Sequence, residues 1–211
     1  MRATLNSRRL CFLFTPRACR HDPWVTLEQA LVAGVDLVQW RVKHRDAAGA
    51  IRARDVCREH DVPLIVNDDV ELALSIDADG AHVGQDDLDV TAARAMLECR
   101  LLGVSTHDLD QLIAAERAGA DYVGFGPMYP TTTKGYVEGK GADAIVPIVA
   151  SATVPVFAIG GITAETVSAL ARAGARHFAV SAALAHAEDP AAATRAILHA
   201  IHIASPNEKK R

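Results

Sequence analysis

The segment LVQWRVK, residues 37–43, begins as an apolar run of strand length and ends in polar side chains. The same change from apolar to polar recurs at six later places, where apolar runs end near residues 67, 84, 105, 126, 160 and 181. In a barrel of alternating strands and helices, the carboxyl ends of all strands meet on one face, and that face carries the active site. The pattern therefore predicts a (β/α)8 TIM barrel with its functional residues on one rim.

Strand and helix patterns alternate along the whole chain, which is typical of parallel βα units. The strand runs are nearly continuous in apolar residues, as expected of strands that are covered on both faces. Thr26 fits a capping box at the first helix, and Thr163 can cap the helix after the double glycine. The strand patterns lie near 11–14, 37–42, 63–67, 81–84, 101–105, 121–126, 155–160 and 177–181, and the helical patterns near 26–33, 47–60, 69–76, 90–98, 108–118, 141–151, 164–173 and 190–202.

An open, doubly wound sheet is the alternative architecture. Functional loops in such a sheet concentrate near one switch point, whereas polar residues here follow seven successive strands, so we favour the closed barrel. No Pro/Ser-rich linker divides the chain. We therefore expect a single domain over residues 1–211, with frayed polar ends at 1–9 and 205–211.

The composition argues against several classes of function. The 22 Lys and Arg residues nearly balance the 26 Asp and Glu residues, so we expect no nucleic-acid partner. The apolar stretches are too short to span a membrane, and no signal-peptide pattern follows the polar start. The four cysteines form no CxxC pair, which favours free thiols in a reducing cytoplasm. The oligomeric state stays open, with a homodimer as one option.

Three polar side chains at the end of the quoted segment have a spacing of two. In a strand, this spacing places Gln39, Arg41 and Lys43 on one face and Trp40 and Val42 on the other. Long polar side chains inside a barrel are costly unless an anion or water meets them. The trio is therefore expected to line the barrel mouth and to bind an anion. The alternative is a register in which the three face solvent.

Carboxylates follow two neighbouring strands. Asn67 and Asp68 end one strand and Asp87 follows the next, and two carboxylates with substrate phosphates suffice for Mg²⁺. The alternative role is helix capping, because Asp68 or Asp69 can cap one helix and Asp89 the next. Asp87 is less easily explained as a cap. The neighbouring basic trio favours the metal interpretation.

Two glycine-containing turns could hold a phosphate. The loop from Gly126 to Gly135 carries hydroxyls and an ammonium, on Thr131, Thr133 and Lys134. We expect this loop to close over bound substrate. Gly160-Gly161 precedes a helix and Val180-Ser181 ends the last strand, which is where barrels often bind phosphate. The alternatives are a solvated polar loop and an ordinary tight turn.

Histidines near the strand ends have two possible roles. His107 follows Ser105-Thr106 and could transfer a proton, although packing at a helix start is an equal alternative. His82 lies in the middle of a strand pattern, so we expect it in the core.

Together these motifs resemble the thiamine phosphate synthase family over roughly residues 11–190. Seven sequence patterns of the family occur here in order. They are Q-x-R-x-K at residues 39–43, N-D at 67–68, G-A-D-G-x-H-x-G-Q-x-D in a run ending at Asp87, G-V-S-x-H at 103–107, P-T-x-T-K at 130–134, I-G-G at 159–161 and V-S at 180–181. Each motif is modest alone, but their order and spacing are specific.

The resemblance implies a (β/α)8 barrel that joins hydroxymethylpyrimidine diphosphate to thiazole phosphate and releases pyrophosphate. It implies a dissociative mechanism, in which a pyrimidine carbocation forms and the thiazole nitrogen captures it. It also implies Mg²⁺ on Asp68 and Asp87. The pyrimidine diphosphate would contact Gln39, Arg41, Lys43, Asn67, Ser105 and Lys134, and the thiazole phosphate would contact Thr131, Thr133, Gly161, Val180 and Ser181. Of these residues, Arg41, Lys43, Ser105 and Lys134 would carry the catalysis.

The chain departs from the family pattern at two places. Val42 replaces a commonly acidic residue, and Gly135-Tyr136 replaces a charged pair after the loop lysine. The second departure is also similar to a sister branch, the thiazole tautomerases, in which His107 would be the proton shuttle. A non-catalytic barrel that binds thiamine precursors is a third option. Retention of the metal aspartates and of the threonine loop favours the synthase.

Overall fold

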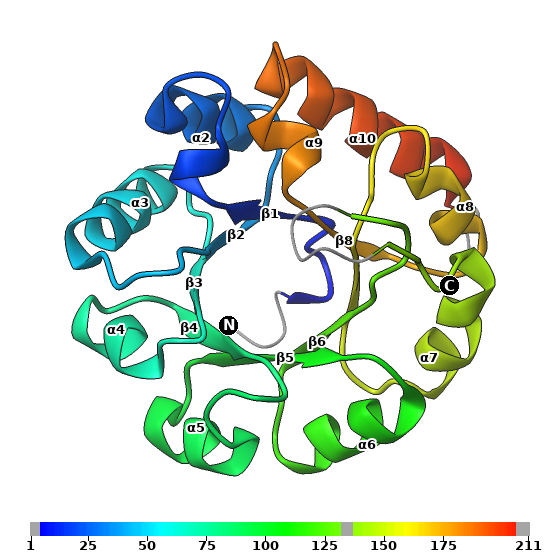
Figure 1. The fold of residues 1–211 in the computed structure, drawn as a ribbon, viewed down its shortest axis with the longest axis horizontal. Helices are drawn as coiled ribbons and strands as arrows, with labels where there is room; N and C mark the ends of the chain where they lie inside the picture. The colour runs from blue at the N-terminus through cyan, green and yellow to red at the C-terminus, as the bar shows by residue number, and fades with distance from the viewer. Residues whose placement is uncertain (1–4, 132–136, 206–211) are drawn as a thin grey trace.

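Eight parallel strands close into a barrel in chain order (Figure 1). The computed structural model describes residues 5–131 and 137–205. β1 pairs with β2 on one side and with β8 on the other, so the sheet has no free edge. This confirms the predicted (β/α)8 barrel and rules out the open sheet. The strands are β1 Leu10–Phe14, β2 Leu37–Trp40, β3 Leu64–Asn67, β4 Gly80–Val83, β5 Leu101–Thr106, β6 Tyr122–Phe125, β7 Val156–Ile159 and β8 His177–Val180.

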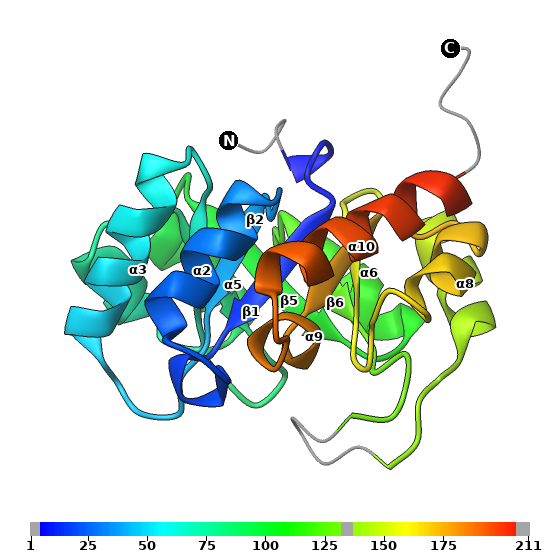
Figure 2. The ribbon, with the colours of Figure 1, turned by 90° about the horizontal axis from the view of Figure 1, so that it is seen from above.

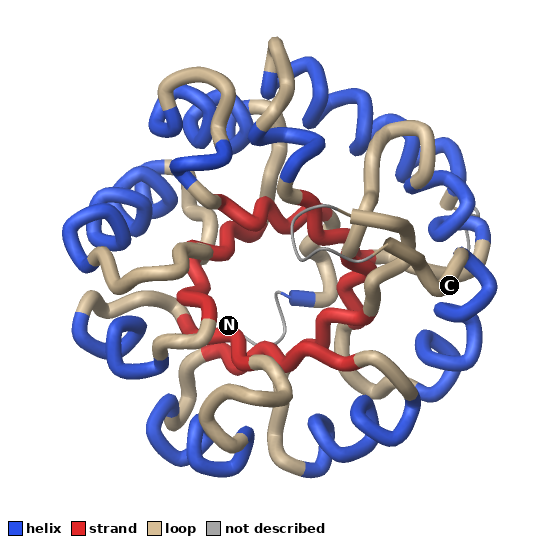
Figure 3. Tube along the Cα trace, in the orientation of Figure 1, coloured by secondary structure: helices blue, strands red, loops and turns tan. Residues whose placement is uncertain are grey.

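Helices form an outer ring around the strands (Figure 3). All eight predicted helical segments contain a helix, and two short ones, η1 and α9, were not predicted. In the described part of the chain, no helix is both long and apolar enough to cross a membrane. The helices are η1 Pro16–Ala18, α2 Pro23–Val32, α3 Ala47–Glu59, α4 Val70–Ser75, α5 Val90–Leu97, α6 Leu109–Arg117, η2 Ala142–Ile145, α7 Val146–Ser151, α8 Val167–Arg172, α9 Ala182–Ala185 and α10 Pro190–Ala204.

Two predicted helix starts are wrong. Helix α2 begins at Pro23, where the carboxylate of Asp22 accepts from the backbone N–H groups of its first turn, and Thr26 lies inside the helix. Proline suits this first position because it has no N–H to leave unpaired. Helix α8 begins only at Val167. The Thr163 backbone N–H instead donates to the Thr166 hydroxyl at 2.9 Å in the turn before that helix.

Alternating side chains along the strands build two apolar layers. The inner layer fills the barrel and includes Leu13, Leu37, Ile65 and Phe157. The outer layer lies between strands and helices, where the Trp40 ring packs at 6.4 Å between centroids on the ring of Trp24 from α2. Trp40 therefore lies on the helix-facing side of β2, as the spacing of two predicted.

The amino-terminal segment lies at the end of the barrel opposite η1 and α9 (Figure 2). Its polar sequence led us to expect a frayed end through residue 9, but Leu5 is only 1% exposed and belongs to the inner apolar layer. The Arg8 carbonyl accepts from the His177 ring at the start of β8. The buried Leu5 thus holds residues 5–9 against the barrel. A segment this short has too little hydrophobic periodicity for this burial to be predicted.

Gly103 in β5 leaves room for two interior rings. A Cβ atom at this position would lie 2.2 Å from Tyr122 Cζ and 2.4 Å from His82 Nδ1. We expect Gly103→Ala to lower the free energy of unfolding by about 1–3 kcal/mol, because packed rings must shift. Urea denaturation measures this loss. Gly124→Ala is the control, since its Cβ would meet His82 at an ordinary 3.4 Å. Equal losses in the two variants would contradict the steric argument.

Candidate active site

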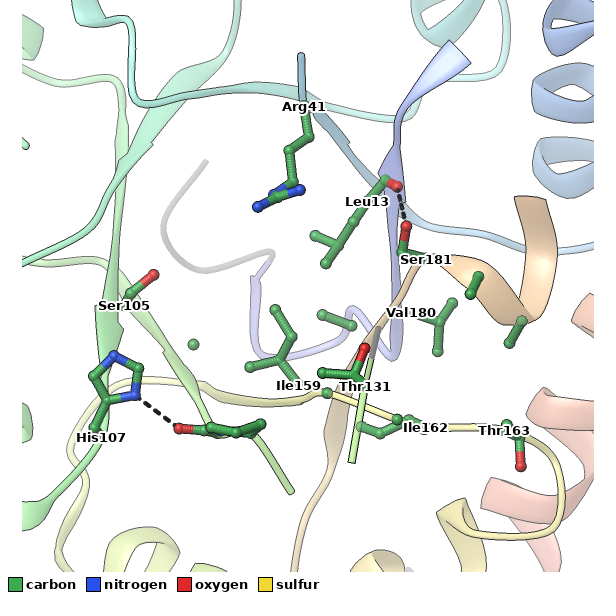
Figure 4. A pocket seen from close by; sticks show the side chains of 18 of the residues that line it. Leu13, Arg41, Ser105, His107, Thr131, Ile159, Ile162, Thr163, Val180 and Ser181 are labelled. Carbon is green, nitrogen blue, oxygen red and sulfur yellow. Dashed lines mark hydrogen bonds between the residues drawn. The ribbon is translucent and has the colours of Figure 1, made fainter. Parts of the chain in front are cut away.

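A cavity of about 140 Å³ opens at the carboxyl ends of the strands (Figure 4). Residues at or just after the ends of β1, β2, β5, β6, β7 and β8 line it, so six strands contribute to one site. Leu13, Ile159 and Ile162 form apolar walls, and Arg41, Ser105, His107 and Thr131 supply polar groups. A cavity with a few convergent polar groups on apolar walls is the usual form of a small-molecule site.

Arg41 reaches the cavity from the first position after β2. Figure 4 shows its guanidinium directed into the open space between Ser105 and Leu13. Two hydrogen bonds hold its backbone against β1: its N–H donates to Phe14 at 2.9 Å, and its carbonyl accepts from the Thr15 hydroxyl at 2.8 Å. These two hydrogen bonds therefore fix the position of the backbone from which the Arg41 guanidinium extends.

The three residues predicted to share one face lie in three different places. Gln39 is buried in the barrel interior at 5% exposure, and Arg41 lines the main cavity. Lys43 is exposed and lines a second cavity of about 430 Å³ beside Asn67 and Asp68. The difference has a simple cause: β2 ends at Trp40, so the alternation of a strand no longer governs Lys43.

The predicted metal carboxylates stand on neighbouring strand tips. Asp68 takes a left-handed backbone (φ 65°), and its N–H donates to the His82 carbonyl at 2.7 Å, which joins the tip of β3 to β4. Asp69, not Asp68, caps α4. Asp87 is exposed, and its Oδ2 accepts from the Gly84 N–H at 2.7 Å.

These oxygen donors are suited to Mg²⁺ only if a bound phosphate group completes the coordination shell. Among the described residues, no three His, Cys, Asp or Glu side chains gather as a complete metal site. Two carboxylates and the Asn67 amide oxygen are hard donors, and Mg²⁺ usually completes its shell with water and substrate phosphate. The donor set is therefore suited to a metal that arrives with a diphosphate.

Ser105 connects the cavity to buried polar groups in the barrel. Its hydroxyl lies 2.9 Å from His82 Nε2, and His82 Nδ1 lies 3.2 Å from the Tyr122 hydroxyl. His82 is 6% exposed, as its mid-strand position predicted. Sequence reasoning missed Tyr122. The signal that could have found it is the glycine at 103, which pairs with Tyr122 and leaves space for its ring.

His107 has a defined tautomer. Its Nδ1 lies 2.8 Å from the Gly126 carbonyl oxygen, which can only accept (Figure 4). The neutral ring therefore carries its proton on Nδ1, and Nε2 keeps a lone pair. His107 also lines the main cavity. The structure thus places it where it can accept a hydrogen bond or a proton.

The double glycine forms a turn into which no side chain fits. Gly160 and Gly161 have φ values of 98° and 64°, and a Cβ at Gly161 would lie 2.6 Å from the Pro130 carbonyl. Val180 and Ser181 line the same cavity, as does Thr131. The Ser181 hydroxyl donates to the Leu13 carbonyl at 3.1 Å. Thr133 and Lys134, and with them the predicted loop closure, lie outside the described residues.

A closed barrel of parallel strands with its cavity at their carboxyl ends defines a TIM-barrel enzyme. The family model described as thiamine monophosphate synthase matches residues 10–184, and the chain belongs to this family. This confirms the family resemblance and, at the level of the family, the expected thiamine-phosphate transferase.

Relatives agree in sequence and in fold. The chain is 43% identical to the thiamine-phosphate synthase of Bacillus velezensis, over 82% of each chain. It is 44% identical to that of Geobacillus kaustophilus, over 84% of this chain and 85% of the relative. A solved thiamine phosphate pyrophosphorylase from Pyrococcus furiosus superposes with a TM-score of 0.85 and 29% identity, over 94% of this chain and 98% of that one.

Proposed function

We propose that the protein condenses hydroxymethylpyrimidine diphosphate with thiazole phosphate to give thiamine phosphate and pyrophosphate. The observation that carries the proposal is the convergence of Arg41, Ser105, Gly161 and Ser181 on one cavity. A second cavity, lined by Lys43 and Asp68, opens at the same end of the barrel, because these residues follow β2 and β3. Both cavities together offer cations and hard oxygens for a diphosphate and a glycine turn for a second phosphate. Membership of the thiamine monophosphate synthase family supports this reading.

Catalysis by this chain requires charge stabilisation more than proton transfer. In the proposed reaction, Arg41, Lys43 and Lys134 neutralise the diphosphate as it leaves, and Asn67 and Ser105 hold the pyrimidine end. Gln39, which is buried in the barrel interior, is a further proposed contact of the pyrimidine substrate. Gly161, Val180, Ser181, Thr131 and Thr133 hold the thiazole phosphate. Two substrates fixed in this way need little further assistance to combine.

The apolar walls of the cavity also keep water from the reacting atoms in the proposed reaction. Leu13, Ile159 and Ile162 line the space between the cationic side and the glycine turn. A carbocation formed there meets the thiazole nitrogen before water, because these walls leave water no hydrogen-bonding partner. Asp68 and Asp87 would hold Mg²⁺, which when bound neutralises charge on the diphosphate oxygens.

One assay tests the proposal. Purified protein with both substrates and Mg²⁺ should release thiamine phosphate and pyrophosphate in equal amounts. A non-catalytic binder would retain the precursors without turnover, and that result would refute the proposal.

Tautomerisation of a phosphorylated thiazole is the second candidate function, because the Nε2 lone pair of His107 is available at the cavity. We expect His107→Ala to retain condensation activity within about tenfold, since the condensation needs no general base. A tautomerase would lose about 10²–10⁴-fold. Condensation rates and conversion of the carboxythiazole phosphate tautomer, measured side by side, separate the two. Tautomer conversion that collapses in the variant, with no condensation by the wild-type protein, would favour the tautomerase.

The remaining proposals concern the cellular location of the protein and its binding partners. Cys11, Cys19, Cys57 and Cys99 are unpaired thiols, which supports a reducing cytoplasm as the location. Burial raises the pKa of the Cys19 thiol to about 11, so this group is unreactive near neutral pH. The partners we propose are the two small-molecule substrates and a second copy of the chain in a homodimer, which sedimentation of the purified protein would detect.

A further inference from the structure

Three polar side chains form a hydrogen-bonded line in the barrel interior, here termed the interior column. It runs from Tyr122 in β6 through His82 in β4 to Ser105 in β5. The two contacts measure 3.2 and 2.9 Å. Only the last member, Ser105, lines the main cavity.

The barrel makes room for this column. Gly103 pairs with Tyr122 and with His82 in the neighbouring strands, and any Cβ there would overlap both rings. Gly124 pairs with Ser105, and its Cβ position lies 3.4 Å from the His82 ring. Buried polar groups are costly unless they are satisfied. Two glycines and three polar residues in adjoining layers therefore form a built feature of the interior.

Hydrogen bonds along the column share one direction. Tyr122 is 3% exposed, and burial raises its pKa well above the usual range, so it keeps its single proton. A buried hydroxyl needs an acceptor for its proton, and His82 Nδ1 lies 3.2 Å from the Tyr122 oxygen. Tyr122 therefore donates to His82 Nδ1. A neutral imidazole has one N–H, so His82 donates from Nε2 to the Ser105 oxygen.

The proton of the Ser105 hydroxyl is thereby directed outward. Its oxygen already accepts from His82, and Figure 4 shows the Ser105 side chain at the cavity wall, facing the space below Arg41. We infer that His82 is a positioning residue that holds Ser105 as a hydrogen-bond donor toward a ring nitrogen of the pyrimidine substrate. This inference rests on the proposed function. It adds a specificity rule: an acceptor atom, not a donor, must face Ser105.

The tautomer of His82 can be observed without turnover. In the wild-type protein with ¹⁵N-labelled histidine, nuclear magnetic resonance should show His82 protonated on Nε2 and bare on Nδ1. The His82→Gln spectrum identifies the resonance by its disappearance. A His82 ring protonated on Nδ1 would overturn the inference even if condensation is normal. Absence of condensation by the wild-type protein would instead overturn the proposed function.

Variants separate positioning from mere packing. His82→Leu should weaken the pyrimidine diphosphate about tenfold in KM, the effect of one lost neutral hydrogen bond, while the KM for thiazole phosphate stays unchanged. His82→Gln should recover most of this loss, because its amide N–H can replace the Nε2 donor. Equal rises in both KM values, or no rescue by glutamine, would mark a structural role and overturn the inference.

The matched control is His177→Leu. His177 is as buried as His82, 8% against 6%, but stands at the opposite end of β8 and hydrogen-bonds to the Arg8 carbonyl. We expect a comparable loss of thermal stability and no selective change in the KM for the pyrimidine substrate. A selective change in this control would show that any buried histidine produces the effect.

Analogues identify the substrate atom. Two unphosphorylated hydroxymethylpyrimidine analogues, each with one ring nitrogen replaced by CH, are compared by calorimetry. One of these analogues should bind to the wild-type protein about tenfold more weakly than the parent compound. The same analogue and the parent compound should bind to Ser105→Ala with equal affinity. If neither replacement matters to the wild-type protein, the assignment of Ser105 to a ring nitrogen is wrong.

Discussion

Arg41→Ala should lower kcat/KM for the pyrimidine diphosphate by about 10²–10³-fold, the usual cost of one group that stabilises charge in the transition state. The guanidinium extends into the cavity in which we propose that the leaving diphosphate gains charge, and the Arg41 backbone is held by Phe14 and Thr15. The loss should fall mainly on kcat, because the charge on the leaving group is greatest in the transition state. Steady-state kinetics with saturating thiazole phosphate measures it.

Two variants accompany this measurement. Arg41→Lys keeps the charge but loses the planar fork that binds phosphate oxygens in pairs, so it should recover only part of the activity. Arg58→Ala is the control, because Arg58 lies on α3, lines neither cavity and hydrogen-bonds to Asp77 at 2.8 Å. We expect it to change kcat/KM less than threefold, as exposed ion pairs contribute little. Equal losses for Arg41→Ala and Arg58→Ala would show that a general loss of structure, not the Arg41 contact, matters.

Removal of Mg²⁺, or Asp68→Asn, should lower turnover by at least ~10³-fold, since a metal ion on a phosphoryl oxygen contributes several kcal/mol of charge stabilisation. Asp68 directly follows β3 and lines the second cavity together with Lys43. Turnover is measured in excess chelator and after Mg²⁺ is restored. Mn²⁺ binding in the presence of pyrophosphate, followed by electron paramagnetic resonance, reports on the site without catalysis.

The adjacent carboxylate provides the control. Asp69 caps α4 by accepting from the Leu72 N–H at 2.7 Å. Asp69→Ala should therefore cost about 1 kcal/mol of stability and leave metal affinity nearly unchanged. Asp87→Asn should weaken the metal, while its amide oxygen can still accept from the Gly84 N–H. Full activity in excess chelator would disprove the metal assignment.

Long-range contacts explain which site features sequence reasoning missed. The bond from His82 to Ser105 spans 23 residues and that from His82 to Tyr122 spans 40. No local pattern encodes either contact. His82 was predicted to be a core residue, and it is, but its burial says nothing of the serine it touches. Lys43 was placed beside Arg41 because strand alternation was carried past Trp40, where β2 ends.

The sequence by itself determined the order of eight strands and eight helical segments, the closed barrel and the rim that carries the cavity. These follow from local periodicity and from the polar residues after each strand, because side-chain spacing decides which face is buried. Only the tertiary structure decided where strands end, how Leu5 enters the barrel, and that Tyr122, His82 and Ser105 form one column. The physical reason is that strand ends and interior contacts depend on pairing between segments far apart in the chain, and the energy of that pairing is absent from any single segment.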